Sequence, residues 1–438
     1  MMFLTRWASD LDWRLLLLTL PPLSLLAFLC LSAVTTTATP NSFYSFAPLK
    51  SFFSHRIPSG SDNSTSPSIP PLPARNNEPM AEDLLKKEEE LKRSRIAICL
   101  VGGARRFELT GPSIVNNLLK VYPNSDLFLH SPLDRDSFKF SLLKVAPRLA
   151  SVRIFEPKPL QETDSQVRVL TAHNSPSGIQ GLLQYFNLVE GCLTMIKAYQ
   201  TQNNFTYDWI VRTRVDGYWS APLHPDNFIP GRYLVPSGSG YSGLNDRLGI
   251  GDLNTSAIAL SRLSLISHLD SAGFRQLNSE AAFKAQLTTQ RVPYLTNRLP
   301  FCIVSDRKYA FPPMRYGVPV ASLSSPGPLS GTKCRPCTPV CSGPCVADVV
   351  ATLYKGWSWT DWSNGSLQLC DAHAEWEPGW EKIFDRVAGK KLAAVRRRVG
   401  SLNLADCVSD FEEMKRRTVN WEAPPATEIC RVGGRSSK

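Results

Sequence analysis

Short apolar runs alternate with amphipathic stretches through the middle of this chain and predict alternating strands and helices. Continuous apolar segments typical of buried strands occur at residues 96–101 (IAICLV), 125–130 (SDLFLH) and 151–155 (SVRIF). Helices are expected at 112–121 and at 178–200, where apolar residues recur at spacings of three and four. Strands separated by helices predict an α/β fold with a mainly parallel sheet flanked by helices, in which ligands bind beyond the carboxyl ends of the strands.

The segment 207–219 (YDWIVRTRVDGYW) is interpreted as a further strand and carries the most chemistry. Alternation places Arg212, Arg214 and Asp216 on one face, and three ionisable groups there must pair with each other or with a ligand. Gly217 ends the strand and leaves Asp216 at its carboxyl rim. A carboxylate in that position can hold a divalent cation while the arginines meet diphosphate oxygens. The alternative is an internal Arg–Asp salt bridge.

A glycine turn with two arginines follows the first predicted strand. Gly102 and Gly103 would let the backbone approach a phosphate or ribose closely, and Arg105 or Arg106 would supply positive charge. The segment matches neither the P-loop nor the dinucleotide-binding fingerprint. An ordinary turn with no ligand is the alternative interpretation.

Further carboxylates occur in the segment 243–252 (GLNDRLGIGD), which is interpreted as a loop and strand edge. Asp246 and Asp252 are candidates for acceptor binding or metal contact, or else for local caps of a turn. A helix over 277–287 opens with an Asn/Ser cap and places Glu280 in its first turn. Glu280 either supports that helix end or acts as a general base facing an acceptor.

The N-terminal region has the pattern of a membrane anchor followed by a stem. Residues 15–34 are free of charge and long enough for a helix that crosses a bilayer, although a cleaved signal peptide is the alternative. Residues 1–14 would form a cytosolic tail. Residues 35–94 would form a stem, which is rich in Ser, Pro and Asn over 57–80 and ends in a charged helix at 81–95.

Cysteines and glycosylation sequons agree with a luminal domain. Eight of the 11 cysteines fall in the last third of the chain, four of them in CRPCTPVCSGPC, and their even number favours disulfides over a zinc site. Cys99 and Cys192 lie among apolar residues and are expected to be buried thiols. Sequons for N-glycosylation occur at four positions, Asn63, Asn204, Asn254 and Asn364.

These segments together resemble two groups of proteins. A strand closing in GGxR, then YDWIVRTRVD, LNDRLGIGD and a helix opening NSE, is similar to a loose class of glycosyltransferases with an R-x-R-x-D strand end. The chain from about 95 to 432, including CRPCTPVCSGPC and GWSWTDWSNGSLQLCDAH, resembles a plant family of uncharacterised, glycosyltransferase-like single-pass membrane proteins. The tryptophans of the latter segment, with Trp376 and Trp380, would stack on sugars or pack a small core.

The first resemblance implies a GT-A-like fold, a nucleotide-sugar donor, a glycan or glycoprotein acceptor, and Mn²⁺ or Mg²⁺ as a cofactor. It implies a metal or diphosphate role for Asp216, and phosphate or strand-end contacts for Arg212 and Arg214. Asp246, Asp252 and Glu280 become candidates for acceptor binding and base catalysis. Because Arg214 stands where the D-x-D motif of such enzymes has its first Asp, its charge could replace part of the metal's work.

We therefore expect a Golgi glycosyltransferase of type II topology, with a catalytic domain at 95–325 and a cysteine-rich subdomain at 326–438. One alternative is a non-catalytic luminal protein that binds carbohydrate or acts as a scaffold. A zinc-containing nucleic-acid binder is suggested by the formal charge of +11, but the predicted membrane span and the sequons argue against nucleic acid.

Overall fold

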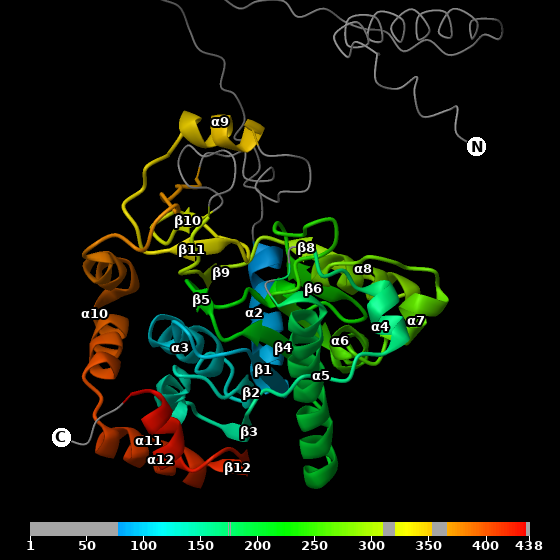
Figure 1. Ribbon diagram of the computed structural model, residues 1–438, viewed down its shortest axis with the longest axis horizontal. Helices are drawn as coiled ribbons and strands as arrows, with labels where there is room; N and C mark the ends of the chain where they lie inside the picture. Colours follow the sequence, from blue (N-terminus) through cyan, green and yellow to red (C-terminus); the bar gives the residue numbers. More distant parts are fainter. Residues whose placement is uncertain (1–77, 174, 176, 310–319, 353–365, 435–438) are drawn as a thin grey trace, which may run out of the picture. The chain divides into compact units, whose positions relative to one another are not determined.

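The apolar run 96–101 forms β1 (Ile96–Val101), a fully buried strand near the middle of the central sheet (Figure 1). Its alternate residues supply two separate cores: Ile98 and Leu100 face one side of the sheet, while Ala97 and Cys99 face the other. The computed structural model describes residues 78–173, 175, 177–309, 320–352 and 366–434.

The central sheet has eight strands in the order β12-β3-β2-β1-β4-β7-β6-β8. Strand β7 runs antiparallel to both of its neighbours, and the other neighbouring pairs are parallel. This arrangement confirms the predicted mixed α/β fold with a mainly parallel sheet flanked by helices. The other strands of this sheet are β2 (Ser125–Pro132), β3 (Leu149–Phe155), β4 (Trp209–Arg214), β6 (Tyr233–Pro236), β7 (Leu248–Asp252), β8 (Tyr294–Asn297) and β12 (Thr418–Glu422).

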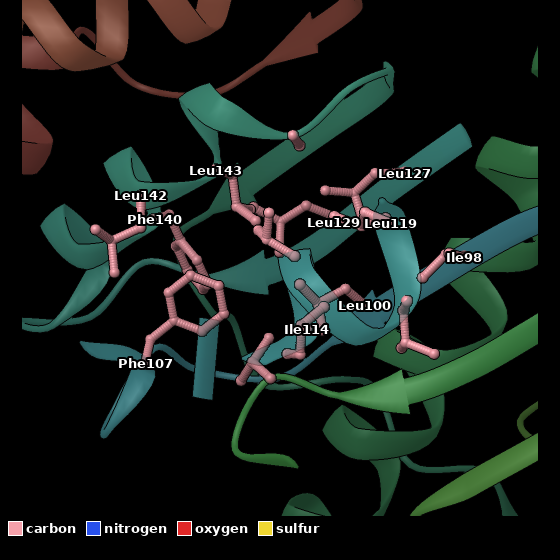
Figure 2. Packing of buried hydrophobic residues seen from close by; sticks show 14 of the residues in the cluster. Ile98, Leu100, Phe107, Ile114, Leu119, Leu127, Leu129, Phe140, Leu142 and Leu143 are labelled. Carbon is pink, nitrogen blue, oxygen red and sulfur yellow. The ribbon is translucent and has the colours of Figure 1, made fainter. Parts of the chain in front are cut away.

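Helices cover both faces of this sheet. The long helix α5 (Gly178–Asn203) packs on the face that holds Ala97 and Cys99, and it confirms the helix predicted at 178–200. On the other face lie α3 (Phe107–Ile114), the π-helical turn η1 (Val115–Leu119) and the 3-10 helix η2 (Ser137–Val145). Figure 2 shows this second core, which includes Ile98, Leu100, Phe107, Ile114, Leu119, Leu127, Leu129, Phe140, Leu142 and Leu143.

Helix α3 begins five residues before the helix predicted at 112–121. Gly111 is a poor helix former and proline is favoured in the first turn of a helix, so the sequence pattern placed the start at Pro112. Tertiary packing overrides that preference, because the ring of Phe107 stacks edge-on against Phe140 at 5.0 Å. Gly111 is required inside the helix, since a Cβ there would collide with the Phe107 ring.

The predicted single strand at 207–219 is divided between two sheets. Strand β4 ends at Arg214, a two-residue turn follows, and β5 (Gly217–Trp219) joins a smaller sheet in the order β10-β11-β9-β5. The change of sheet depends on Gly217, because a Cβ at that position would collide with the ring of Phe301. The other strands of the small sheet are β9 (Phe301–Val304), β10 (Ala321–Ser322) and β11 (Lys333–Arg335).

The predicted division into domains at 95–325 and 326–438 does not describe two folding units. Strand β12 from the C-terminal region pairs with β3, and α11 (Leu404–Arg416) and α12 (Ala426–Val432) add Phe411 and Ile429 to the main core. The described residues belong to one compact unit within residues 75–438. Apolar residues of the C-terminal region are needed to close the core, and a composition shift cannot reveal that.

The charged helix assigned to the stem is part of the same unit. Helix α2 (Glu78–Arg93) buries Leu91 in the main core, and Lys87 forms an ion pair with Asp226 at 3.0 Å. The stem therefore does not extend to residue 94 as predicted. The remaining helices are α4 (Asp164–Val169), α6 (Leu253–Leu260), α7 (Ile266–Ser271), η3 (Pro225–Asn227), α8 (Ser279–Thr289), α9 (Pro344–Thr352) and α10 (Trp380–Gly400).

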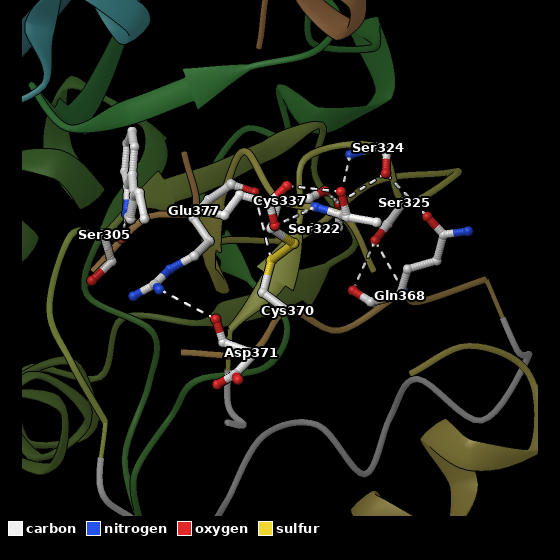
Figure 3. The surroundings of a disulfide bond; sticks show 12 residues. Ser305, Ser322, Ser324, Ser325, Cys337, Gln368, Cys370, Asp371 and Glu377 are labelled. Carbon is white, nitrogen blue, oxygen red and sulfur yellow. Dashed lines mark hydrogen bonds between the residues drawn. A yellow bond between two sulfur atoms is a disulfide. The ribbon is translucent and has the colours of Figure 1, made fainter. Parts of the chain in front are cut away.

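All ten cysteines in the described part of the chain form disulfides. The C-terminal framework is confirmed, with the pairs Cys302–Cys334, Cys337–Cys370, Cys341–Cys345 and Cys407–Cys430. Around the Cys337–Cys370 bond, serine hydroxyls at 322–325 bond to Gln368 and to the Cys337 carbonyl, which fastens two distant segments together (Figure 3). The zinc alternative fails, because the cysteines of CRPCTPVCSGPC belong to three different disulfides.

The prediction that Cys99 and Cys192 are buried thiols was wrong. Cys99 on β1 and Cys192 on α5 are buried and face each other, with Cα atoms 6.2 Å apart, and they form a disulfide. Burial alone cannot distinguish a thiol from a disulfide when the partner lies 93 residues away in the sequence.

The predicted membrane span at 15–34 lies outside the described residues, as do the cytosolic tail and the Ser/Pro-rich part of the stem. Among the helices that the structure describes, none is long and apolar enough to cross a membrane.

The disulfide between β1 and α5 should stabilise the fold measurably. Replacing Cys99 and Cys192 together by Ala removes a cross-link over 93 residues, and we expect the free energy of unfolding to fall by about 2–4 kcal/mol. Denaturant unfolding measures this loss, and the Cys341→Ala, Cys345→Ala variant, which opens a much shorter loop, should lose less. Recovery of Cys99 as an alkylated free thiol from the non-reduced protein would contradict the pairing.

Candidate functional site

A buried ion pair stands at the turn where β4 leaves the central sheet. The Arg214 guanidinium donates from Nε and from one terminal nitrogen to the two Asp216 oxygens, at 2.8 and 2.6 Å. The Asp216 side chain is 4% exposed and that of Arg214 28% exposed. Burial alone would raise the pKa of Asp216, but the charges of Arg214, Arg105 and Arg247 lower it below its usual value. Asp216 is therefore an ionised carboxylate held in a fixed position.

This pair bears on the expected metal role of Asp216. Both of its oxygens accept from Arg214, so the internal salt bridge that was the alternative interpretation is the arrangement observed. Within the described ranges, no group of three His, Cys, Asp or Glu side chains is placed to hold a metal ion. The residues at this position therefore do not fit Mn²⁺ or Mg²⁺.

A buried polar network that includes Arg212, Asp246 and Arg262 lies next to the pair. Arg212 donates to the Tyr185 hydroxyl at 3.0 Å, and that hydroxyl donates to the Asp246 carbonyl at 2.7 Å. The Asp246 carboxylate lies 3.5 Å from Arg262 and accepts from Ser279. Burial would raise the pKa of Asp246, but Arg262 and Arg212 lower it. Arg212 and Asp246 therefore form an interior wall of the site, not the ligand contacts that were expected.

Arg247 and Glu280 lie on the open side of that wall. Their charged groups are 3.8 Å apart, and the Glu280 side chain is 15% exposed. Asn278 caps helix α8, because its side-chain oxygen accepts from the Ala281 N–H at 2.8 Å, so Glu280 is not the capping group. Burial first, and then the charge of Asp246, raise the pKa of Glu280 to about 7 against the opposing effect of Arg247. Such a carboxyl group can exchange a proton at neutral pH.

Asp252 does not belong to the site. It pairs in register with Trp209, at the amino end of β4, on the order of 20 Å along the strand from Asp216. Its side chain caps helix α6 by accepting from the Thr255 N–H at 2.8 Å, and it also accepts from the Gly231 N–H at 2.6 Å. The local cap that was the alternative interpretation is its observed role, and its expected catalytic role is corrected.

The glycine turn after β1 is shaped by a protein side chain. Gly102 has φ +118°, a conformation that favours glycine, and a Cβ on Gly103 would collide with the Asp134 carboxylate. Gly103 therefore accommodates Asp134 and Gly102 the turn itself, while a phosphate contact at these glycines remains a prediction.

The two arginines of that turn have different surroundings. The Arg106 guanidinium lies 4.3 Å from the Trp376 ring centre and 5.4 Å from that of Trp380, so these tryptophans hold an arginine. Arg105 is exposed, and its charge contributes to the lowered pKa of Asp216. Arg105 is thus the arginine of this turn that belongs to the site.

Sequence reasoning missed two cationic residues and two tyrosines. Lys333 at the start of β11 lies 4.7 Å from the Tyr309 ring centre and 6.0 Å from that of Tyr241, and Arg307 lies 5.8 Å from the same Tyr309 ring. Burial, Arg247 and Arg307 lower the pKa of Lys333 to about 7. The sequence offers no signal for Lys333 beyond its place next to Cys334.

We call the set Arg105, Arg214, Arg247, Arg307 and Lys333 the cationic cluster. These five side chains are accompanied by two carboxylates, Asp216 and Glu280. Repulsion from neighbouring arginines acts to lower the pKa of Arg247 and of Lys333. The cluster lies beyond the carboxyl end of β4, where α/β proteins bind ligands. Its unbalanced positive charge can be compensated by a bound anion.

A cavity of about 500 Å³ lies at the opposite, amino edge of the sheet. Arg95, Asn124 and Arg148, which each stand immediately before or within a few residues of a strand start, are among its lining residues. It contains none of the predicted site residues.

The chain belongs to a protein family described as Domain of unknown function (DUF7796), whose model matches residues 91–436. Comparison with curated proteins finds no match. Among solved structures, the fold is similar in part to mouse xyloside xylosyltransferase 1 in its apo form. The identity is 13%, the TM-score is 0.31, and the match covers 47% of this chain and 84% of that one.

Removing one charge from the interior wall, to which Arg262 also belongs, should destabilise the folded protein. We expect Arg262→Met to lower the free energy of unfolding by about 3–5 kcal/mol, because it removes the ion-pair partner of the buried Asp246 carboxylate. Adding Asp246→Asn should restore part of that loss, which a double-mutant cycle in urea measures. Equal stability of the wild type and Arg262→Met would refute the assignment of Arg262 to the structural wall.

Removing the charge of Lys333 should instead raise the free energy of unfolding. We expect Lys333→Met to raise the free energy of unfolding by about 1–4 kcal/mol, because it removes a buried cation that is surrounded by like charges. The folded pKa of Lys333 is about 7 and the ordinary value 10.5, so the unfolded chain binds more protons between those pH values. The gain should therefore be largest at pH 7 and shrink toward pH 10. Arg153→Met, which removes an exposed ion pair with Glu422, is the matched control and should show neither effect.

Proposed function

We propose that this protein is a glycosyltransferase that moves a sugar from a nucleotide-sugar donor to a glycan or glycoprotein acceptor in the Golgi lumen. The observation that carries the proposal is the cationic cluster, five positive side chains with two carboxylates at the carboxyl edge of a mainly parallel sheet. A nucleotide sugar presents a diphosphate with two negative charges, which matches this excess. The predicted GT-A-like character of the fold and the resemblance of the R-x-R-x-D strand end are parts of the same proposal.

Arginine and lysine would do the work that a metal ion performs in D-x-D enzymes. Arg214 is fixed by Asp216 yet retains exposed surface, so its free N–H groups can donate to phosphate oxygens. Arg105, Arg247 and Lys333 add charge around the same point. Negative charge on the diphosphate grows as the bond between the anomeric carbon and the phosphate oxygen breaks. A cluster that is positive before the reaction stabilises that transition state more than the bound donor.

Glu280 is the general base in this proposal. The acceptor hydroxyl oxygen bonds to the anomeric carbon, its proton passes to the Glu280 carboxylate, and the nucleoside diphosphate leaves with the electron pair of the broken bond. Base catalysis is most effective when the pKa of the base lies near the working pH, and the pKa of Glu280 is raised to about 7. Asp216 keeps Arg214 in place and is a positioning residue.

The proposed location rests on the disulfides. Five disulfides in the described part of the chain are typical of a protein that folds in an oxidising compartment. An anchor at 15–34 would tether the enzyme to the Golgi membrane with its catalytic unit in the lumen, as the hydrophobic pattern predicts.

Donor binding and turnover test the proposal separately. The purified full-length protein is titrated with UDP-, GDP- and CMP-sugars, with Mn²⁺ or with EDTA. We expect one donor class to bind in EDTA, and Arg214→Met to weaken it about 10- to 100-fold by removing charged hydrogen bonds. Glu280→Gln should keep donor binding while its turnover falls about 10²- to 10⁴-fold. At saturating donor and acceptor, the wild-type kcat should rise with pH through about 7 as Glu280 loses its proton.

Arg153→Met serves as the control for removing an arginine, because its ion pair with Glu422 is exposed and joins β3 to β12 at the far edge of the sheet. A requirement of Mn²⁺ for donor binding would contradict the proposal that arginines replace the metal. Donor binding without turnover on any acceptor would favour the alternative function, a luminal carbohydrate-binding protein. Failure of every donor to bind a folded protein would remove the nucleotide-sugar site altogether.

A further inference from the structure

The backbone of the small sheet places Lys333 beside the ion pair at the end of β4. Gly217, Ile303 and Lys333 lie in register across β5, β9 and β11, so Lys333 is two strands, or about 10 Å, from the residue that follows Asp216. The Val304 N–H donates to the Asp216 carbonyl at 2.8 Å, which joins β9 directly to the turn. The disulfide Cys302–Cys334 then fixes β11 to β9. Lys333 therefore has a set position relative to Arg214 and Asp216.

In the part of the chain that the structure describes, no carboxylate forms a salt bridge with the ammonium group of Lys333. This group lies near the rings of Tyr309 and Tyr241. Arg247 is anchored two residues away, because it donates to the Gly331 carbonyl at 3.3 Å. The remaining cations that act on Lys333 are Arg307 and Arg214, and the opposing carboxylate is Glu280.

We propose that Lys333 binds the diphosphate of the donor and takes up a proton from solvent as it does so. The inference rests on the proposed function and adds to it the state of charge of one residue. In the free protein, repulsion from the arginines and burial hold the pKa of Lys333 near 7, so much of the side chain is the neutral amine above that pH. Two phosphate charges supply the missing counter-ion and favour the ammonium, which then donates N–H groups to phosphate oxygens.

Proton uptake makes donor affinity dependent on pH. Between the pKa of Lys333 in the free protein, about 7, and its higher value in the complex, binding consumes up to about one proton. The donor affinity should therefore fall as pH rises above 7, by up to tenfold for each pH unit. The pKa of Glu280 is also raised to about 7, so this carboxyl group is the alternative source of proton uptake that the experiment has to distinguish from Lys333.

Calorimetry separates these sources. The full-length protein is titrated with UDP-glucose and GDP-mannose at pH 8 in buffers of different ionisation enthalpy, because the diphosphate esters do not themselves titrate there. Lys333→Arg keeps a permanent charge, so we expect binding without proton uptake and with an affinity that is constant from pH 7 to 9. Lys333→Met should lose most of the affinity. Glu280→Gln should retain the uptake, and Arg153→Met should bind as the wild type does.

The outcomes distinguish this inference from the proposed function. Proton uptake by the wild type that disappears in Lys333→Arg supports the assignment. Donor binding with no proton exchange, or with an uptake that persists in Lys333→Arg, overturns it while leaving the nucleotide-sugar site intact. If proton uptake is lost only in Glu280→Gln, the proton is taken up by Glu280, and the assignment to Lys333 is rejected. If neither ligand binds to the folded protein, the proposed function fails for these donors and the inference fails with it.

Discussion

The arrangement of the site depends on the ion pair between Arg214 and Asp216. It spans the two-residue turn where the chain passes from β4 in the central sheet to β5 in the small sheet. Val215, between the two, donates its backbone N–H to Val101, and Asp216 accepts from Val304 through its carbonyl. Backbone hydrogen bonds of this turn therefore join the ends of β1, β4 and β9, and the salt bridge spans the same turn. Arg105 follows β1, and Lys333 lies in β11, which pairs with β9.

Charges around this pair fall into two groups with different physical roles. In the wall formed by Arg212, Asp246 and Arg262, cations and the carboxylate are buried together and are held by Tyr185 and Ser279. The cationic cluster in front has more positive charge than its carboxylates can balance. Buried charges that are hydrogen-bonded within the protein contribute structure, whereas cations without a carboxylate partner cost stability unless a ligand completes them. The imbalance is thus evidence for binding, which a simple count of polar residues would not provide.

Local sequence patterns predicted strands at the positions of β1 to β4, the long helix α5, and the position of Arg212, Arg214 and Asp216 at a strand end. They also found Glu280, because a helix start has a recognisable composition. They failed where a role depends on contacts between distant segments. Asp252 pairs with the amino end of β4, far from Asp216, and Gly103 lies against the Asp134 carboxylate. The pairing of β12 with β3 shows the same limit at the scale of a domain.

Lys333 and Arg307 come from the region between β9 and the cysteine-rich segment, so that region completes the site instead of forming an appendage. A lysine among like charges would move away from them if its strand were free to do so. Strand β11 is paired with β9 and β10 and linked through Cys302–Cys334, and Arg335 donates to three carbonyls of neighbouring segments. These contacts hold the cations together before any anion arrives. The cost of ordering them is met during folding, so an anion that enters the cluster finds its partners already in place.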